Sequence, residues 1–304
     1  MNDSPSGIVP QETRFDTILR FTLPMRGARG RCVRLGPVVD EVLSAHDYPE
    51  AVRHALCEAL VLTALMGSLI KHEDGQMTMQ AQSDGGIIGL LACDYRGGEL
   101  RGYVRHDAAR LGSHGANTAL ADLFGANSYL AITFDLADGK GRYQGIVPLE
   151  GDTLTGACES YFRQSEQVPS VIRVAVRFDG ERCVAGGMLV QHLPEGEEGR
   201  ERLHAKTDDP DWEHVAILSG SVRHAELVDP GLSLEAVLWR LFHEEEAVRV
   251  EAGDCLSRGC RCSLEHYENV LRRFGEEERI EMRDPDGTIP VDCAFCSKIF
   301  RVEI

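Results

Sequence analysis

Four cysteines near the C-terminus constrain this chain more than any other feature of its sequence. They form two close pairs, Cys260 with Cys262 and Cys293 with Cys296, and residues 263–292 separate the pairs. Two pairs of thiols brought together by a folded loop suit a tetrahedral zinc ion, which binds four thiolates. A centre closed by four sulfurs has no open coordination position for a substrate. We therefore expect a structural centre or a redox switch rather than a metalloenzyme.

The six other cysteines fall into two groups. Cys255 lies near the first pair, but a fifth sulfur exceeds what a tetrahedral ion binds, so we expect it to be a bystander. His266 follows the first pair and is interpreted as a surface histidine rather than a ligand. The remaining five stand singly in apolar segments and are expected to be small buried residues: Cys32, Cys57, Cys93, Cys158 and Cys183.

The acidic charge of the chain narrows its partners and its compartment. Its 304 residues carry a formal net charge of −17. Nucleic acids and anionic membranes both attract clustered Lys and Arg, so we expect neither as a partner. The N-terminus lacks a basic segment followed by an apolar run, and the most apolar stretch, 55–70, is too short to span a bilayer. We expect a cytoplasmic protein, in which thiols stay reduced.

Residues 1–192 predict an α+β domain with a mostly antiparallel sheet and packed helices. Residues 50–71 form a helix that is apolar nearly all round, which indicates a core helix. The glycine pairs at 97–98 and 186–187 are interpreted as turn or bulge residues. Alternating apolar residues bounded by turn residues predict strands over 77–82, 87–93, 100–105, 129–135, 142–149, 171–178 and 183–191.

Residues 193–249 predict an acidic insertion followed by a helical linker. The insertion, 195–211, has few apolar residues and is typical of a solvated segment. Helices are expected over 212–224 and 233–246, and Ser233 caps the second. An acidic run closes that helix where its dipole is already negative. We interpret this end either as one that loosens easily or as an ordinary solvated run.

Residues 250–304 predict a small zinc-binding redox domain that cannot fold without a staple. So short a segment buries little apolar surface, whereas structural zinc contributes roughly 10–16 kcal/mol at neutral pH. A helix over 263–274 and a hairpin that presents the second cysteine pair are expected. Metal removal should unfold this segment. Oxidation removes thiolate ligands in pairs, so the same centre can act as an unfolding switch, and a purely structural zinc centre is the alternative.

The whole chain also resembles one protein family. The tail carries Cys-X-Cys and Cys-X-X-Cys about thirty residues apart, and several other segments carry the resemblance: 46–50, 143–152, 160–162, 165–167, 185–189 and 238–246. Together these segments resemble the heat-shock protein 33 family of redox-regulated chaperones. The resemblance extends from about residue 15 to residue 302.

The resemblance implies an ATP-independent holdase chaperone and not an enzyme. By the family pattern, Cys260, Cys262, Cys293 and Cys296 hold one Zn²⁺ in the reduced, inactive protein. Oxidation is then expected to join Cys260 to Cys262 and Cys293 to Cys296, to release zinc and to unfold the tail and linker. The oxidised protein forms a homodimer and binds unfolding client proteins. Two features depart from the pattern, namely Cys255, through which mixed disulfides could form, and the length of the acidic insertion.

Two other functions compete with this interpretation. The pair Cys293 and Cys296 has the spacing of a dithiol–disulfide oxidoreductase, although no strand leads into a helix that begins at this motif. A zinc-ribbon nucleic-acid module has similar spacing, but the acidic charge and the scarcity of lysine near the pair weigh against it.

Overall fold

The computed structural model describes residues 14–70, 74–112, 118–136, 141–149, 151, 153–193 and 209–304. Most of the predicted acidic insertion, 195–208, lies outside these residues. Among the residues described, no helix is both long and apolar enough to cross a membrane.

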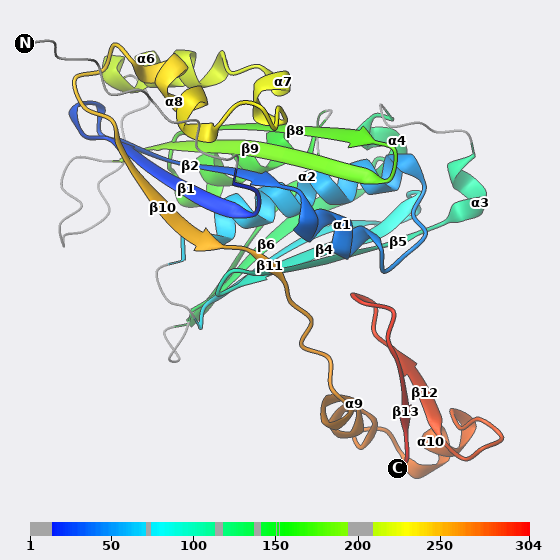
Figure 1. Cartoon of the computed structure of the whole chain (residues 1–304). Helices are drawn as coiled ribbons and strands as arrows, with labels where there is room; N and C mark the ends of the chain where they lie inside the picture. The colour runs from blue at the N-terminus through cyan, green and yellow to red at the C-terminus, as the bar shows by residue number, and fades with distance from the viewer. Residues whose placement is uncertain are drawn as a thin grey trace, which may run out of the picture.

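Two sheets build the body of the molecule (Figure 1). The five-stranded sheet has the order β10 (Arg249–Cys255), β1 (Thr17–Leu23), β2 (Ala28–Leu35), β9 (Arg182–His192) and β8 (Ser170–Asp179). The six-stranded sheet has the order β11 (Ser257–Arg258), β5 (Glu99–His106), β4 (Ile88–Arg96), β3 (Gln76–Ser83), β6 (Ser128–Leu136) and β7 (Gly141–Pro148). Of these pairings only β11 with β5 is parallel. The predicted α+β fold with a mostly antiparallel sheet is confirmed.

Helix α2 (Glu50–Gly67) packs between the two sheets and forms the centre of the core (Figure 1). It is apolar on almost every face because both sheets cover it, as the sequence predicted. A Cβ atom on Gly102 of β5 would lie 2.9 Å from Leu56, and one on Gly187 of β9 would lie 2.5 Å from Val61. Glycines therefore let both sheets approach this helix closely.

The interpretation of Gly186 and Gly187 as turn or bulge residues is wrong. Both lie inside β9, in regular register with β2 and β8. A Cβ atom on Gly186 would lie 2.2 Å from the carbonyl oxygen of Leu227, on the face opposite α2. The strand needs glycine at both positions because other segments press on both of its faces. Gly97 and Gly98, by contrast, have positive φ values and form the turn between β4 and β5.

Shorter helices complete the body. Helix α5 (Leu154–Tyr161) begins after Thr153, whose hydroxyl accepts a hydrogen bond from the Gly156 N–H. The other short helices of the body are the 3-10 helix η1 (Pro24–Arg26), α1 (Pro37–Leu43), α3 (Ala108–Leu111), α4 (Leu120–Phe124) and the π-helix η2 (Phe162–Glu166).

Three linker helices cover the outer face of the five-stranded sheet (Figure 1). They are α6 (Pro210–Gly220), α7 (His224–Leu227) and α8 (Leu234–Phe242), and we call them the linker cover. Phe242 packs on Phe21 of β1 with ring centroids 5.8 Å apart. The predicted cap is confirmed, because the Ser233 hydroxyl accepts from the Ala236 N–H. The cover hides a second apolar core, separate from the one around α2.

A buried arginine fastens the linker cover to the sheet. Arg34 of β2 is fully buried and donates hydrogen bonds to three backbone carbonyls of the linker. The distances are 2.7 Å to Leu227, 2.6 Å to Leu232 and 2.9 Å to Glu226. A buried cation needs such partners, so detaching the cover would have to rehydrate it or leave it unpaired.

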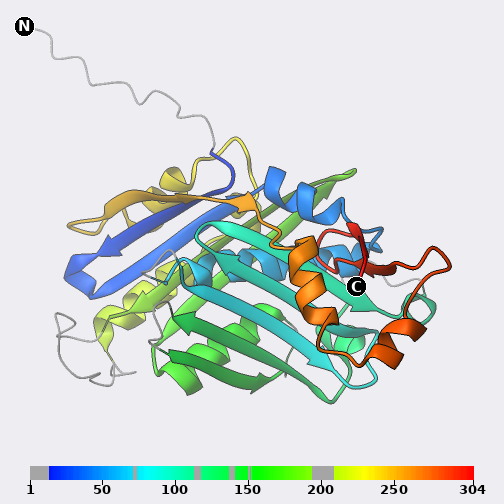
Figure 2. The same cartoon turned by 90° about the horizontal axis from the view of Figure 1, so that it is seen from below.

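The chain then crosses the body before it reaches the cysteines. After α8 it adds β10 and β11 to the two sheets, so residues 250–258 lie in the body. We therefore propose residue 259 as the start of the C-terminal unit, rather than residue 250. This unit, 259–304, contains α9 (Leu264–Leu271), α10 (Glu276–Glu281) and the hairpin of β12 (Ile289–Asp292) and β13 (Ile299–Val302). Figures 1 and 2 place it against the six-stranded sheet, on the side of the molecule away from the linker cover.

Candidate metal centre

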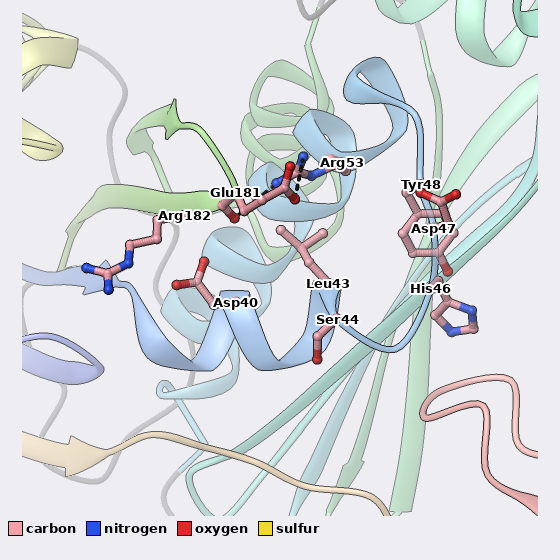
Figure 3. Close-up of a pocket in the computed structure, with 9 residues that line it drawn as sticks. All are labelled: Asp40, Leu43, Ser44, His46, Asp47, Tyr48, Arg53, Glu181 and Arg182. Atoms are coloured by element: carbon pink, nitrogen blue, oxygen red, sulfur yellow. Dashed lines mark hydrogen bonds and ion pairs between the residues drawn. The ribbon is translucent and has the colours of Figure 1, made fainter.

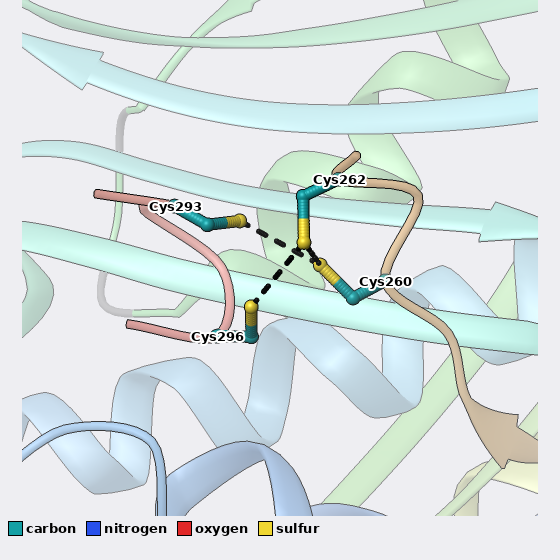
Figure 4. Close-up of side chains that lie close together, drawn as sticks. All are labelled: Cys260, Cys262, Cys293 and Cys296. Atoms are coloured by element: carbon teal, nitrogen blue, oxygen red, sulfur yellow. Dashed lines mark hydrogen bonds between the residues drawn. The ribbon is translucent and has the colours of Figure 1, made fainter. Parts of the chain in front are cut away.

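The structure brings the four predicted cysteines together (Figure 4). Cys260 and Cys262 lie between β11 and α9, whereas Cys293 and Cys296 lie between β12 and β13. The Sγ atom of Cys260 is 3.3 Å from that of Cys262 and 3.6 Å from that of Cys293. The Sγ atoms of Cys262 and Cys296 are 3.6 Å apart. All four sulfur atoms lie within 4.8 Å of one another.

These separations fit a four-coordinate metal. Metal–sulfur bonds of about 2.3 Å arranged as a regular tetrahedron put the sulfurs about 3.8 Å apart. A disulfide needs about 2.05 Å, and all four residues are free thiols. The cluster therefore fits a thiolate metal site. Cys255 is exposed beside Thr17 and His266 is exposed on α9, and neither belongs to the cluster.

The second cysteine pair occupies the turn of the C-terminal hairpin. The Cys293 N–H donates to the carbonyl of Lys298 at 3.0 Å, and the N–H groups of Cys296 and Ser297 donate to the carbonyl of Cys293 at 3.2 and 2.8 Å. Ser297 has a φ of +56°, which closes the turn. A hairpin presents the second pair, as predicted, but its turn is the cysteine pair itself and not Asp286 and Gly287, which the sequence suggested and which lie between α10 and β12. We call residues 293–297 the knuckle.

Hydrogen bonds make the four thiols unequal. Burial raises the pKa of the Cys293 thiol, but hydrogen bonds from the Tyr267 hydroxyl and from the N–H groups of Phe295 and Cys296 outweigh it and lower the pKa to about 6. Burial and the neighbouring thiols raise the pKa of Cys262. Four thiolates this close repel one another, so a dication is needed for all of them to ionise together.

The C-terminal unit has a small core in which a cysteine takes part. Its buried residues are Leu271, Ile289, Cys293, Phe300 and Val302. The other three cysteines pack against this cluster. So few apolar side chains contribute little folding energy by themselves. Because the cysteines belong to this core, a metal bound to them would stabilise the whole unit.

The knuckle also docks the C-terminal unit on the body. The Phe295 ring lies beneath the Arg101 guanidinium, which is 4.0 Å from the ring centroid. The Tyr103 ring forms a T-shaped contact with the same ring, with centroids 4.9 Å apart. Both partners belong to β5, on the face of the six-stranded sheet that points away from α2. A cation–π contact of this kind contributes about 0.5–2 kcal/mol.

A second set of knuckle contacts reaches the loop between α1 and α2. The Ser297 hydroxyl donates to the carbonyl of Ala45 at 2.6 Å and lies 3.1 Å from Nδ1 of His46. Nε2 of His46 lies 2.9 Å from the carbonyl oxygen of Ala294. A carbonyl oxygen only accepts, so this histidine nitrogen carries a proton.

The first cysteine pair docks on the same sheet. Arg261, which separates Cys260 from Cys262, donates to Oε1 of Gln76 at 2.8 Å and lies 3.6 Å from the Asp94 carboxylate. That carboxylate is 5% exposed and also accepts from Arg101 at 2.7 Å. Candidate metal ligands and docking residues therefore share both turns.

These docking residues were not predicted from the sequence. Arg101 and Tyr103 alternate with inward-facing residues of β5, a pattern common to many half-exposed strands. The position of Phe295 between two metal-ligand candidates was the available signal. A large apolar side chain in a short polar turn needs a surface to cover it.

Known proteins match almost the whole chain. The family model described as Hsp33 protein matches residues 16–303. A 33 kDa chaperonin of Caulobacter vibrioides is 39% identical over 295 residues, which cover 95% of each chain. A 33 kDa chaperonin of Shigella boydii is 34% identical over 281 residues, which cover 92% of this chain and 90% of that one.

A solved structure supports the fold. The crystal structure of the 33 kDa chaperonin (heat shock protein 33 homolog) from Thermotoga maritima aligns with a TM-score of 0.77 at 22% identity and covers 95% of both chains. At 22% identity this structure supports the fold alone, whereas the family model and the two bacterial relatives identify the family. On these matches, the chain belongs to the Hsp33 family.

Proposed function

We propose that this protein is a redox-regulated, ATP-independent holdase that binds unfolding client proteins. Its relatives are named chaperonins, and chaperones of this family are not enzymes. The observation that carries the regulation is the knuckle, in which metal ligands and docking residues occupy one turn. We further propose a cytoplasmic location, where the thiols stay reduced until an oxidant arrives.

The soft four-thiolate set favours zinc as the metal. In this proposal, Cys260, Cys262, Cys293 and Cys296 hold one Zn²⁺ in the reduced, inactive protein. A peroxide would then join Cys260 to Cys262 and Cys293 to Cys296. Formation of each disulfide would take two electrons from a pair of thiolates, and one peroxide would take up these electrons and two protons from solvent to become two waters. Each bond also removes two thiolate ligands, so zinc leaves and the C-terminal unit loses its staple.

Strands β10 and β11 supply the route from the metal centre to the linker. They lie between α8 and Cys260 in the chain, so the first cysteine pair of the metal centre follows directly after β11. Strand β10 is an edge strand, largely exposed, that pairs with β1 alone. Release of the C-terminal unit would leave only buried Leu256 and the two-residue strand β11 to hold that end of the segment, and peeling of β11 and then β10 would reach the end of α8.

The surface beneath the linker cover is suited to client binding. Its residues come from β1 and β9 and are at most 7% exposed: Leu19, Phe21, Leu23, Met188 and Val190. Once uncovered, this apolar face would bind the apolar segments that unfolding proteins expose. The edge of β1 left by β10 would also be open for pairing, which supports a homodimer in the oxidised state.

The proposal is tested on the full-length, zinc-loaded protein treated with hydrogen peroxide under mild heat. Released zinc, free thiols and suppression of aggregation of an unrelated unfolding protein are measured on the same samples. We expect loss of one zinc together with the four clustered thiols, and aggregation suppression only afterwards. The Cys255→Ser variant is the control and should behave like the original chain. If the oxidised protein left client aggregation unchanged, the holdase proposal would fail.

The same samples test the oxidoreductase alternative. In that class of enzyme, a Cys-X-X-Cys pair begins a helix, whereas here the pair forms a hairpin turn. Catalytic turnover in an insulin-reduction assay would favour the enzyme.

A further inference from the structure

Two more thiols lie in contact inside the body, far from the metal centre in the chain. Cys57 is on α2 and Cys183 is the second residue of β9, and their Sγ atoms are 3.4 Å apart. Cys57 is 0% exposed and Cys183 is 1% exposed. Within the described part of the chain, this is the only thiol–thiol contact outside the metal centre. The holdase proposal makes no use of it.

The pair lies close to an exposed hairpin tip. Cys183 follows the turn between β8 and β9, where the Glu181 side chain is 97% exposed. Arg53, one helical turn before Cys57 on α2, pairs with Glu181 at 3.6 Å. The Asp40 carboxylate accepts a hydrogen bond from the Cys183 N–H at 2.8 Å. Arg53 also donates to the carbonyl of Glu181 at 3.2 Å, so oxidation of the pair requires a local opening that breaks these polar contacts.

A pocket of about 350 Å³ opens beside this tip (Figure 3). Its lining includes Asp40, which accepts from the Cys183 N–H, Arg182, which precedes Cys183 in the chain, and the ion pair of Arg53 with Glu181. A small oxidant in this pocket is next to the hairpin turn that covers the thiols. The pocket therefore provides a way in when the tip opens.

We infer that Cys57 and Cys183 form a third disulfide in the oxidised protein, which joins α2 to β9. The two thiols need neither the metal nor the C-terminal unit to react, whereas the order in which the disulfides form rests on the proposed function. Burial raises the pKa of Cys57 well above its ordinary value, so the closed fold keeps this thiol unreactive. The bond should therefore form more slowly than those at the metal centre.

The oxidant is a peroxide. One thiol gives up its proton, and its sulfur attacks a peroxide oxygen. The O–O bond breaks, leaving a sulfenic acid and water. The sulfur of the second thiol then attacks the sulfenic sulfur, so the S–S bond forms and a second water leaves. The two thiols lose two electrons and two protons in total, and the peroxide is reduced to two waters.

The cross-link would brace the body while the tail opens. It closes a loop over residues 58–182, and cross-links across long loops restrict the unfolded chain most. The central helix would then stay attached to the sheet that presents the proposed client surface.

The test is peptide mapping of the full-length, zinc-loaded protein during a peroxide time course. Free thiols are blocked, the protein is digested without reductant, and the peptides are identified by mass spectrometry. We expect a linked peptide containing Cys57 and Cys183, which appears after the metal-centre thiols are lost. Cys158, which is equally buried on α5, should stay a free thiol. The inference is overturned if both cysteines remain fully blocked as thiols, or if Cys158 oxidises equally fast.

Thermal unfolding gives a second readout. The midpoint temperature at which the body unfolds should be about 5 °C or more higher in the oxidised protein than in the same protein after reductant is added. The Cys57→Ala and Cys183→Ala variants should lack this difference. Peptide mapping of the unaltered chain decides the question even if these variants fold poorly. Zinc release and client aggregation, measured alongside, report separately on the proposed function.

Discussion

At the scale of single residues, Phe295 connects metal binding to docking. It is adjacent to Cys296 and two residues from Cys293, both candidate metal ligands, while its ring contacts Arg101 and Tyr103 on the body. A substitution here removes docking contacts without removing a sulfur. The two roles of the knuckle can therefore be separated experimentally.

The Phe295→Ala variant should keep its zinc but dock more weakly. Loss of the cation–π contact costs about 0.5–2 kcal/mol, which corresponds to a factor of about 2–30 in the detached population. We expect the zinc of the reduced variant to be removed several-fold faster by a fixed concentration of chelator. Phe274→Ala provides the matched control, because Phe274 belongs to the same unit and is 40% exposed. An unchanged rate for Phe295→Ala would show that the knuckle does not control opening.

Glu245 shows why the acidic end of α8 is not simply loose. Its side chain is 5% exposed and is bonded to Arg26 at 2.8 Å and His214 at 2.9 Å. The Arg26 hydrogen bond, aided by His214, holds the pKa of Glu245 below its ordinary value of 4.5. A carboxyl group whose pKa is lower in the folded state than in the unfolded state stabilises the fold at any pH above the unfolded-state pKa. This stabilisation is lost as the pH falls from the unfolded-state pKa through the folded-state pKa.

The Glu245→Gln variant should therefore lose stability in a pH-dependent way. We expect the linker of the reduced protein to be destabilised by about 1–2 kcal/mol at neutral pH. The difference should shrink as pH falls below 4.5. Urea unfolding followed by tryptophan fluorescence measures it, because both tryptophans, Trp212 and Trp239, lie in the linker helices. Glu244→Gln is the control, and an equal loss at all pH values would contradict the assignment.

At the scale of elements, the linker cover is held by one apolar stripe and a few polar anchors. On α8, Leu238 is 1% exposed and faces the sheet, whereas Trp239 is 67% exposed and faces away. The helix thus offers a buried and an exposed substitution at adjacent positions.

Leu238→Ala should loosen the cover while the metal stays bound. Truncation of a buried leucine costs about 2–5 kcal/mol, and here the loss falls on the contact between α8 and the sheet. We expect the reduced variant to suppress client aggregation partially without any oxidant. Trp239→Ala should remain as inactive as the unaltered reduced protein. If Leu238→Ala were equally inactive, the covered face would not be the client surface.

The elements also show what could be predicted from the sequence. Strands with one buried face, such as β3, alternate cleanly and were predicted, as was the core helix α2. Strands β1 and β2 were missed although β1 alternates buried Leu19, Phe21 and Leu23 with less buried residues, and only the second half of β2 is buried on both faces. The four cysteines were predicted to meet, but their docking partners come from β5 and the α1–α2 loop, which only tertiary packing brings to them.

At the scale of the whole molecule, the two parts that must respond to oxidation lie on opposite sides of the body. The C-terminal unit rests on the six-stranded sheet and the linker cover on the five-stranded one (Figures 1 and 2). The centre of the body is rigidly packed around α2, which favours transmission along the covalent path through β10 and β11. The account therefore requires the tail and the cover to open while the core of the body stays folded.

Amide hydrogen exchange, read by mass spectrometry, tests this requirement most directly. Reduced protein is compared with its zinc bound and after chelation, with thiols protected throughout. We predict that residues 259–304 lose protection together with β10 and the linker helices, while α2 and β2–β9 keep theirs. A metal-stripped protein whose final segment exchanged as slowly as before would contradict the account.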